Sequence, residues 1–319
     1  MRLLTRPAPA APPLSAPPVP PPPAGVPHWL PSAPCTPGHC LAGTHPEVGR
    51  TRRVARRTAG IAVLAVGLAL APLVRRCRPD LRDRLTRAWA RAVPAAFGVR
   101  VDIRASGTAA RLPAGGVLVV ANHISWLDIP LVAAVLPARM LAKSEVASWP
   151  VLGPLVSRGG TLFIERDRLR ALPDTVARIA SVLRAGTPVV VFPEGSTWCG
   201  RRQGRFRPAV FQAALDAGVT VQPVLIRYRL ADAGPATAAA FVGEDTLLAS
   251  LLRVTAARGL VAEVSVLPPI PPGTHPDRRS LARAAERAVT GPRPGPEDRH
   301  GPLPKAPHAT NAPRLSGAN

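Results

Sequence analysis

A histidine and an aspartate lie five residues apart in the segment 122–128, which reads Asn-His-Ile-Ser-Trp-Leu-Asp. On one continuous helix this spacing would place the two side chains about 140° apart, so they can meet only where the chain turns. Pro130 disfavours helical conformation at the residue before it, which predicts that a helix begins at Pro130 and that His123 and Asp128 share the preceding turn. A carboxylate fixes the tautomer of an imidazole and makes its other nitrogen a better proton acceptor. The pair therefore predicts a general base.

Two other interpretations of this segment remain open. Ser125 could be the N-cap of a helix with Asp128 as the acidic partner in a capping box, although Pro130 would then break a hydrogen bond within that helix. Alternatively, Ser125 or Ser196 could act as the nucleophile of a serine-type lipid hydrolase with His123 as its base. The chain lacks the G-x-S-x-G nucleophile elbow, which disfavours the hydrolase.

Two further apolar runs lead into polar residues. The run 161–164 is followed by Arg166, whose guanidinium offers a bidentate fork for a phosphate or an ion pair with a neighbouring carboxylate. The segment 192–196 reads Phe-Pro-Glu-Gly-Ser. Its proline and glycine force a tight turn that presents Glu194 and the backbone N–H groups after it.

These residues need a framework, and the pattern from about 101 to 289 supplies one. Predicted strands are Val117–Ala121, Thr161–Ile164, Pro188–Phe192, Val219–Tyr228 and Leu260–Leu267; predicted helices are Pro173–Ala185, Pro208–Ala217 and Arg278–Val289. Such alternation is typical of an α/β domain with a largely parallel central sheet flanked by helices. The active groups of these sheets gather beyond the carboxyl ends of the strands. Pro223 within the fourth predicted strand indicates a sheet edge or a bulge.

The blocks Asn122-His123-x4-Asp128, Gly160-x2-Phe163-Ile164-x-Arg166, Phe192–Ser196 and the Pro223 strand, taken in order, resemble those of the glycerolipid acyltransferases. The resemblance covers about residues 117–266 and is strongest to the bacterial 1-acyl-sn-glycerol-3-phosphate acyltransferase (lysophosphatidic acid acyltransferase) family. One departure is an alanine, Ala209, where the family commonly has glycine in a Phe-x-x-Gly sequence.

The resemblance implies a fold, a reaction and a set of site residues. The fold would be glycerolipid acyltransferase-like. The reaction would move a fatty acyl group from acyl-CoA or acyl carrier protein to the free hydroxyl of 1-acyl-sn-glycerol 3-phosphate, making phosphatidic acid; another lyso-lipid, such as a lyso-aminolipid, remains an alternative acceptor. His123 would be the general base and Asp128 its partner. The implied substrate-binding residues are Arg166, Glu194, Gly195 and Ser196, and no metal or bound cofactor is expected.

The charge and one hydrophobic run predict a membrane as partner. Forty-one Lys+Arg against nineteen Asp+Glu give a net charge of +22, which favours polyanionic partners. No recognition-helix or finger signature supports nucleic acid. The run Ala59–Val74 would span about 24 Å as a helix, short of the roughly 30 Å of a bilayer core, and arginines flank both of its ends. We expect it to dip into the cytoplasmic leaflet of the cell membrane, held by anionic lipids. A spanning helix, a buried core helix and a signal-like sequence remain alternatives.

Composition divides the chain into four parts. Residues 1–46 hold fifteen of the forty-one prolines and no acidic residue, which predicts a disordered tail, as does the Pro-rich segment 291–319. Between them we expect a membrane-associating helical segment at 50–98 and the α/β domain at 99–290. Cys35, His39, Cys40 and His45 cluster in the first segment, so a zinc site is conceivable. Without flanking strand or helix signals, reduced thiols are the simpler interpretation.

Overall fold

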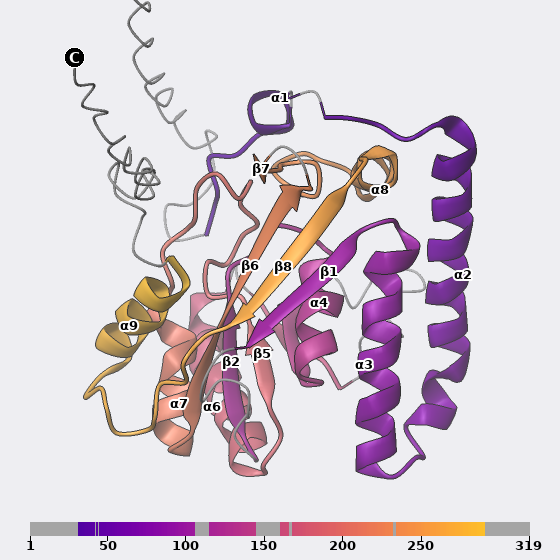
Figure 1. Ribbon diagram of the computed structural model, residues 1–319. Coiled ribbons are helices and arrows are strands. Elements are labelled where there is room, and N and C mark those ends of the chain that lie inside the picture. The colour runs from indigo at the N-terminus through magenta and orange to yellow at the C-terminus, as the bar shows by residue number, and fades with distance from the viewer. Residues whose placement is uncertain are drawn as a thin grey trace, which may run out of the picture.

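The computed structural model describes residues 31–41, 43, 45–105, 115–144, 160–165, 168–231 and 234–290. Within them a central sheet lies between two layers of helices (Figure 1). Its strands are β1 (Arg100–Ala105), β2 (Val117–Ala121), β3 (Arg139–Lys143), β4 (Leu162–Ile164), β5 (Val189–Val191), β6 (Thr220–Leu230), β7 (Gly234–Pro235) and β8 (Leu260–Val266). The spatial order is β1-β8-β6-β2-β5-β3-β4, with β7 paired to β6. Neighbours are parallel except at β6–β8 and β6–β7.

The helices cover the sheet in two groups. They are α1 (Pro37–Cys40), α2 (Arg50–Val74), α3 (Pro79–Ala96), α4 (Asp128–Val135), α6 (Leu172–Arg184), α7 (Phe211–Ala217), α8 (Leu247–Ala256) and α9 (Arg278–Thr290), with short 3-10 turns at Leu169–Ala171 and Pro208–Val210. Side chains of β2 alternate between two apolar clusters. Val119 and Ala121 join residues of α3, α4 and α8, whereas Leu118 and Val120 join residues of α6, α7 and α9. This alternation explains why β2 is apolar at every position.

The sequence-based prediction of a largely parallel α/β sheet flanked by helices is confirmed, and each predicted strand and helix is present. Sequence reasoning missed β1, β3 and α8. β1 is an edge strand with exposed and half-buried residues, so it lacks the continuous apolar run that identified β2. β3 is short and half-buried for the same reason.

The structure corrects one expectation about proline and decides between the two alternatives of another. The helix α4 begins at Asp128 rather than at Pro130; the first four N–H groups of a helix have no partner within it, so Pro130, in the first turn, costs no hydrogen bond. Pro223 does not mark a sheet edge, because β6 lies between β2 and β8. It lies at a bulge-like irregularity: the regular β6–β8 ladder begins at Val224, Leu267 N–H donates to Pro223 O at 3.1 Å, and Val221 and Ile270 form an isolated bridge.

The N-terminal segment also differs from the expected tail. Within residues 31–46, α1 forms and both Cys35 and Cys40 are buried. The next residues join the domain, since Val48 N–H donates to Ala256 O at 2.8 Å. The other parts of the predicted tails, 1–30 and 291–319, lie outside the described residues.

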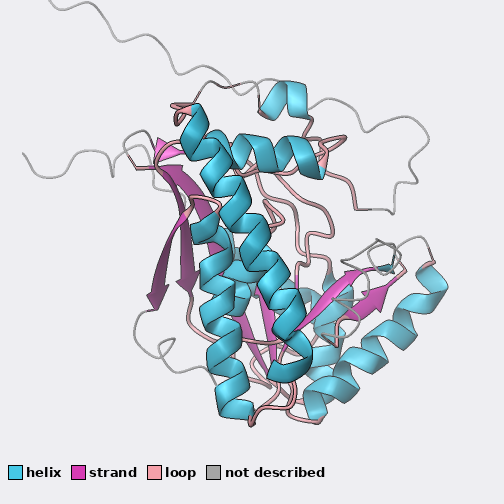
Figure 2. Ribbon diagram, turned by 90° about the vertical axis from the view of Figure 1, so that its right-hand side faces the viewer, coloured by secondary structure: helices cyan, strands magenta, loops and turns pink. Residues whose placement is uncertain are grey.

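α2 and α3 form a helical hairpin at one side of the molecule (Figures 1 and 2). Glycine makes the close approach possible: a Cβ atom at Gly60 would collide with the Phe97 ring, and one at Gly67 with the Trp89 ring. Trp89 also donates from its indole nitrogen to Val63 O at 2.9 Å. The predicted run Ala59–Val74 is thus the second part of a longer helix of 25 residues.

The outer face of this hairpin is apolar and exposed. Its large apolar side chains are Val54, Ile61, Val66, Leu70 and Leu73 on α2, and Leu81 and Leu85 on α3. We call these seven residues the hairpin surface. By length and composition α2 could cross a membrane, and only 6% of its most apolar window is buried in the protein. Within the part of the chain that the structure describes, the hairpin surface therefore lacks the packing partner that an apolar helix face normally has.

Candidate active site

His123 and Asp128 meet in the turn between β2 and α4. The Nδ1 atom of His123 lies 2.9 Å from Oδ2 of Asp128. The same carboxylate oxygen accepts hydrogen bonds from two backbone amides of the turn, Ile124 N–H at 2.6 Å and Ser125 N–H at 2.8 Å. The turn therefore folds back over the first residue of α4, which is how a spacing of five brings the two side chains together.

Asp128 is fully buried, and every hydrogen bond that the structure gives its side chain is accepted by a carboxylate oxygen. Besides the histidine and the two amides, Tyr228 donates from its hydroxyl to Oδ1 at 2.7 Å. Burial and the adjacent carboxylate raise the pKa of Tyr228 well above its usual value, which keeps the hydroxyl a donor. Because Oδ2 accepts a hydrogen bond from Nδ1–H of His123, the lone pair of the imidazole lies on Nε2. A buried, fully bonded carboxylate holds the ring in one tautomer and one orientation.

The rest of His123 is held from three directions. Phe192 stacks on its ring, with centroids 4.1 Å apart. Its backbone N–H donates to Glu194 Oε2 at 2.6 Å, and its carbonyl accepts from Trp198 N–H at 2.8 Å. The side chain keeps 19% of its surface exposed, whereas that of Asp128 has none. The ring is thus held on several sides while part of the side chain stays open to solvent.

Glu194 is buried and accepts the hydrogen bond from the backbone of His123. Its second oxygen, Oε1, accepts from Gly204 N–H at 2.9 Å, so both oxygens are bound to backbone amides. Burial raises the pKa of Glu194 to about 8, although the amides of His123 and Gly204 oppose that rise. The carboxyl group joins the His123 turn to the loop between β5 and α7. This geometry makes Glu194 a positioning residue.

The other residues predicted to bind substrate are placed less completely. Arg166 lies outside the described residues. Gly195 has a φ of 77° and contacts the N-terminal segment, since a Cβ atom there would lie 2.5 Å from Pro31. The hydroxyl oxygen of Ser196 is buried and has no hydrogen-bond partner among the described residues. The structure therefore brings Glu194, Gly195 and Ser196 to the same strand end as His123.

Neither candidate nucleophile is positioned as a serine hydrolase requires. Ser125 is fully buried, and its oxygen accepts from Leu127 N–H at 3.2 Å. The Nδ1 atom of His123 is committed to Asp128, and no hydrogen bond joins the imidazole to either Ser125 or Ser196 among the described residues. A serine nucleophile needs its base within hydrogen-bond reach.

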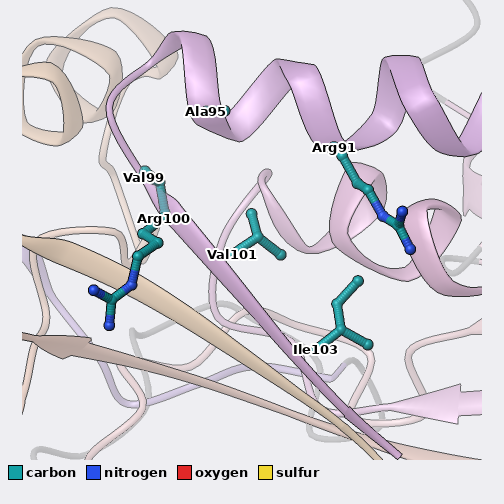
Figure 3. A pocket seen from close by; sticks show the side chains of 6 residues that line it. All are labelled: Arg91, Ala95, Val99, Arg100, Val101 and Ile103. Atoms are coloured by element: carbon teal, nitrogen blue, oxygen red, sulfur yellow. The ribbon is translucent and has the colours of Figure 1, made fainter.

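One hollow among the described residues lies away from the His123 turn. It has a volume of about 430 Å³ and lies between α3 and the edge strand β1. Figure 3 shows Val101 and Ile103 pointing from β1 toward α3, with Arg91 above them. Its lining includes none of the residues around His123, so the hollow is not the site of proton transfer.

Sequence reasoning missed three residues that shape the site. Tyr228 is the only tyrosine of the chain and ends a predicted strand, a signal that could have suggested it. Phe192 was read only as part of a turn. Asn122 belongs to the quoted motif without a role, and its side-chain amide pairs with both backbone groups of Ile226, at 2.8 and 2.9 Å. That pair ties the end of β2 to β6, the strand that carries Tyr228.

Comparison with known proteins agrees with this arrangement. Residues 102–227 match the family model described as Acyltransferase. The chain is 40% identical over 240 residues to a lyso-ornithine lipid O-acyltransferase of Pseudomonas aeruginosa, covering 73% of this chain and 89% of the relative. It is 34% identical over 211 residues to a 1-acyl-sn-glycerol-3-phosphate acyltransferase of Neisseria meningitidis, covering 66% of this chain and 81% of the relative.

A solved structure supports the fold. The 1-acyl-sn-glycerophosphate acyltransferase PlsC of Thermotoga maritima superposes with a TM-score of 0.57, at 18% identity, over 75% of this chain and 94% of that one. The sequence relatives match this chain over most of their own length, and the fold of PlsC is the same layered α/β sheet. The chain is an acyltransferase and belongs to the glycerolipid acyltransferase family.

Proposed function

We propose that this protein transfers a fatty acyl group from an acyl thioester to the free hydroxyl of 1-acyl-sn-glycerol 3-phosphate and so makes phosphatidic acid. The observation that carries the proposal is the His123–Asp128 pair, with a buried carboxylate at one end and an exposed imidazole at the other. An alcohol is a poor nucleophile until a base removes its proton. The pair is built to perform that step.

The reaction needs two proton transfers, one from the acceptor hydroxyl to His123 and one from His123 to the leaving thiolate. His123 Nε2 takes the hydroxyl proton as the acceptor oxygen attacks the thioester carbonyl, and Asp128 stabilises the imidazolium that forms. Collapse of the tetrahedral intermediate breaks the carbon–sulfur bond, and the imidazolium returns its proton to the thiolate. A thioester already has a good leaving group, so the transfer requires neither a covalent enzyme intermediate nor a metal or bound cofactor.

Arginines near Glu194 support an anionic acceptor. Arg201, Arg205 and Arg207 lie exposed on the loop that follows Glu194. We also assign to Arg166 the role of holding the acceptor phosphate, as its place in the motif implies. Fixing the phosphate would aim the hydroxyl at His123 and supply the proximity that accelerates transfer. The donor would be acyl-CoA or acyl carrier protein.

A lyso-ornithine lipid is the second candidate acceptor. The sequence identity of 40% to the lyso-ornithine lipid O-acyltransferase of Pseudomonas aeruginosa favours this acceptor. Both acceptors offer a free hydroxyl to the same base, but the ornithine lipid presents an amino-acid headgroup instead of a phosphate.

The membrane is the place where either acceptor is found. We propose that the hairpin surface inserts into the cytoplasmic leaflet, with the flanking arginines against anionic headgroups. The exposure of Ile61, Val66 and Leu73 supports insertion, because each would otherwise face water.

A panel assay tests the proposal. The membrane fraction is incubated with labelled acyl-CoA or acyl carrier protein and with each of the two lyso-lipids, and products are identified by mass spectrometry. Phosphatidic acid as the main product is expected. A product from lyso-ornithine lipid alone would replace the acceptor, and free fatty acid in every reaction would indicate a hydrolase.

A variant tests the phosphate contact. Arg166→Lys keeps the charge but loses the bidentate fork, so it should raise the KM for the acceptor while leaving the KM for the donor nearly unchanged. An equal rise in both would contradict a direct contact with the phosphate.

A further inference from the structure

Three cysteine side chains converge beside the active-site loop. Cys35 and Cys40 come from the N-terminal segment around α1, and Cys199 comes from the loop between β5 and α7. Their sulfur atoms all lie within 4.8 Å of one another. The three residues are 4%, 6% and 3% exposed, and none is in a disulfide. Two of the thiols are thus separated from the third by some 160 residues of sequence and brought together by the fold.

Buried thiols are often only small apolar side chains, but here three of them, from two segments far apart in the sequence, converge on one point. Hydrogen bonds from the Cys35 side chain and from the backbone amides of Arg201 and Arg202 lower the pKa of Cys199 to about 5, against the opposing effect of burial. Hydrogen bonding to Cys199 raises the pKa of Cys35, and burial raises that of Cys40.

The backbone around Cys199 suits a thiolate. Gly200 has a φ of 82°, a conformation that glycine adopts without strain. It turns the chain so that the backbone amides of Arg201 and Arg202 hydrogen-bond to the sulfur of Cys199. In the N-terminal segment, Cys40 N–H donates to Thr36 O at 2.9 Å, so that Cys40 ends α1 while Cys35 directly precedes its N-cap.

We propose that Cys35, Cys40 and Cys199 bind a thiophilic divalent cation, with zinc as the metal that fits this donor set. Zinc–sulfur bonds of about 2.3 Å place tetrahedral sulfurs about 3.8 Å apart, so a spread of at most 4.8 Å needs only a small contraction. Each sulfur binds as a thiolate, so the thiol protons that are still present are released to solvent when the cation binds. It needs no oxidant, because the sulfurs remain at the thiolate level.

His45 is the side chain that we expect to supply the fourth ligand, and it would have to move to do so, because its ring nitrogens lie outside the group of three sulfurs that are within 4.8 Å of one another. It follows Cys40 by five residues, and its Nε2 atom is buried without a hydrogen-bond partner among the described residues. An imidazole is a common companion of thiolates at structural zinc, which is bound by four protein ligands. A buried nitrogen without a partner also needs an explanation of its own.

The metal would fasten the N-terminal segment to the machinery around His123. Cys199 directly follows Trp198, whose N–H donates to the carbonyl of His123. A Cβ atom at Gly243 would lie 2.9 Å from Cys35 O, so the segment already packs closely on the domain. Removing the cation should therefore loosen the loop that positions His123.

Metal content of the full-length protein is the direct test, and it does not depend on the acyl acceptor. The protein is purified under reducing conditions, dialysed against a weak chelator and measured by mass spectrometry for zinc. We expect about one zinc per chain, and a loss of most of it in Cys35→Ser and Cys199→Ser. Cys77→Ser is the matched control, because Cys77 lies in the turn between α2 and α3 and should retain the metal. Equal loss in the control would overturn the assignment.

A second measurement uses only the wild-type chain, in case the variants fail to fold. Apoprotein titrated with Co²⁺ should develop a sulfur-to-metal charge-transfer band that saturates at about one equivalent. Excess zinc should raise the Tm of the apoprotein by at least about 5 °C, because a ligand that binds only the folded state stabilises it. In His45→Ala the zinc affinity should fall at least about tenfold; an unchanged affinity would remove His45 from the site. Absence of the charge-transfer band, or a disulfide between Cys35 and Cys199 in freshly purified protein, would overturn the proposal.

Discussion

The His123 turn and the hairpin surface differ in how far their side chains are exposed to water. At the turn, the buried carboxylate of Asp128 has four hydrogen-bond partners inside the protein, and only 19% of the His123 side chain is exposed. On the hairpin, large apolar side chains such as Ile61 and Leu73 are more than half exposed. At the turn, all of these hydrogen-bond partners come from the protein itself. On the hairpin surface, the apolar side chains would leave water only by contact with another apolar phase.

This difference separates two kinds of function in one fold. The turn holds His123 through a connected network of hydrogen bonds, each of which contributes to its orientation. The hairpin surface would hold the enzyme at a membrane through the apolar area that it buries there, to which each side chain contributes. Substitutions at the turn should therefore affect turnover without affecting membrane binding, and substitutions on the hairpin surface should do the reverse.

The largest effect is expected from His123→Ala. Loss of the general base should lower kcat by at least about 10², with an unchanged circular dichroism spectrum and unchanged sedimentation with membranes. Asp128→Asn should have a comparable or smaller effect, because it misorients the imidazole without removing it. Ser125→Ala and Ser196→Ala should each keep kcat within about tenfold. A dead Ser196→Ala enzyme with a trapped acyl-serine would replace direct transfer by a hydrolase-like mechanism.

The hairpin surface provides the reverse experiment. Ile61→Asp/Val66→Asp should reduce binding to anionic vesicles by at least about tenfold, because two apolar contacts of about 1.5–3 kcal/mol each are lost. The double variant Thr274→Asp/Thr290→Asp adds the same charge at and near α9, on the other side of the molecule from α2 (Figure 1), and should bind normally. Equal sedimentation of both double variants with vesicles would show that the anchor lies elsewhere.

A smaller effect is expected from Tyr228→Phe. The change removes the hydrogen bond to Asp128 Oδ1 but leaves the contact with His123 in place. We expect kcat to fall roughly three- to tenfold, since one of several bonds to a charged group is lost. The lower limb of the kcat–pH profile should also shift, whereas KM should not. A profile identical in shape to that of the wild type would indicate a merely structural role.

The smallest effect is expected in the free energy of unfolding, through the titration of Glu194. The pKa of Glu194 is raised to about 8, so the folded state holds a proton that the unfolded state, with a pKa near 4.3, has released. Between those two values the unfolded state binds fewer protons, and this group lowers the free energy of unfolding as pH rises, by at most about 1.4 kcal/mol per pH unit. Above pH 8 its contribution is constant.

Glu194→Gln removes this titration. In urea unfolding at pH 5, 6, 7 and 8, the stability difference between the wild type and the variant should shrink as the pH increases. A difference independent of pH would mean that Glu194 is ionised throughout this range, held by its two backbone amides.

Much of the site could be predicted because it is local. His123, Asp128 and the intervening residues 124–127 lie on one turn, and the strand ends that carry Glu194 and Gly195 follow from short apolar runs bounded by proline and glycine. The start of α4 was misplaced because the rule for proline inside helices does not apply to the first turn. β1 was missed because an edge strand does not need apolar side chains on both faces.

What the sequence determined by itself is therefore the α/β alternation, the turn that holds the base and the basic, apolar segment before them, since each depends on residues close together in the chain. Only the tertiary structure revealed that Tyr228 reaches Asp128, that Glu194 turns inward to hold His123, and that Cys199 meets Cys35 and Cys40. These contacts join segments about 70 to 160 residues apart, and their partners are selected by the order of strands in the sheet. No local periodicity encodes that order, because it results from packing both faces of one sheet at once.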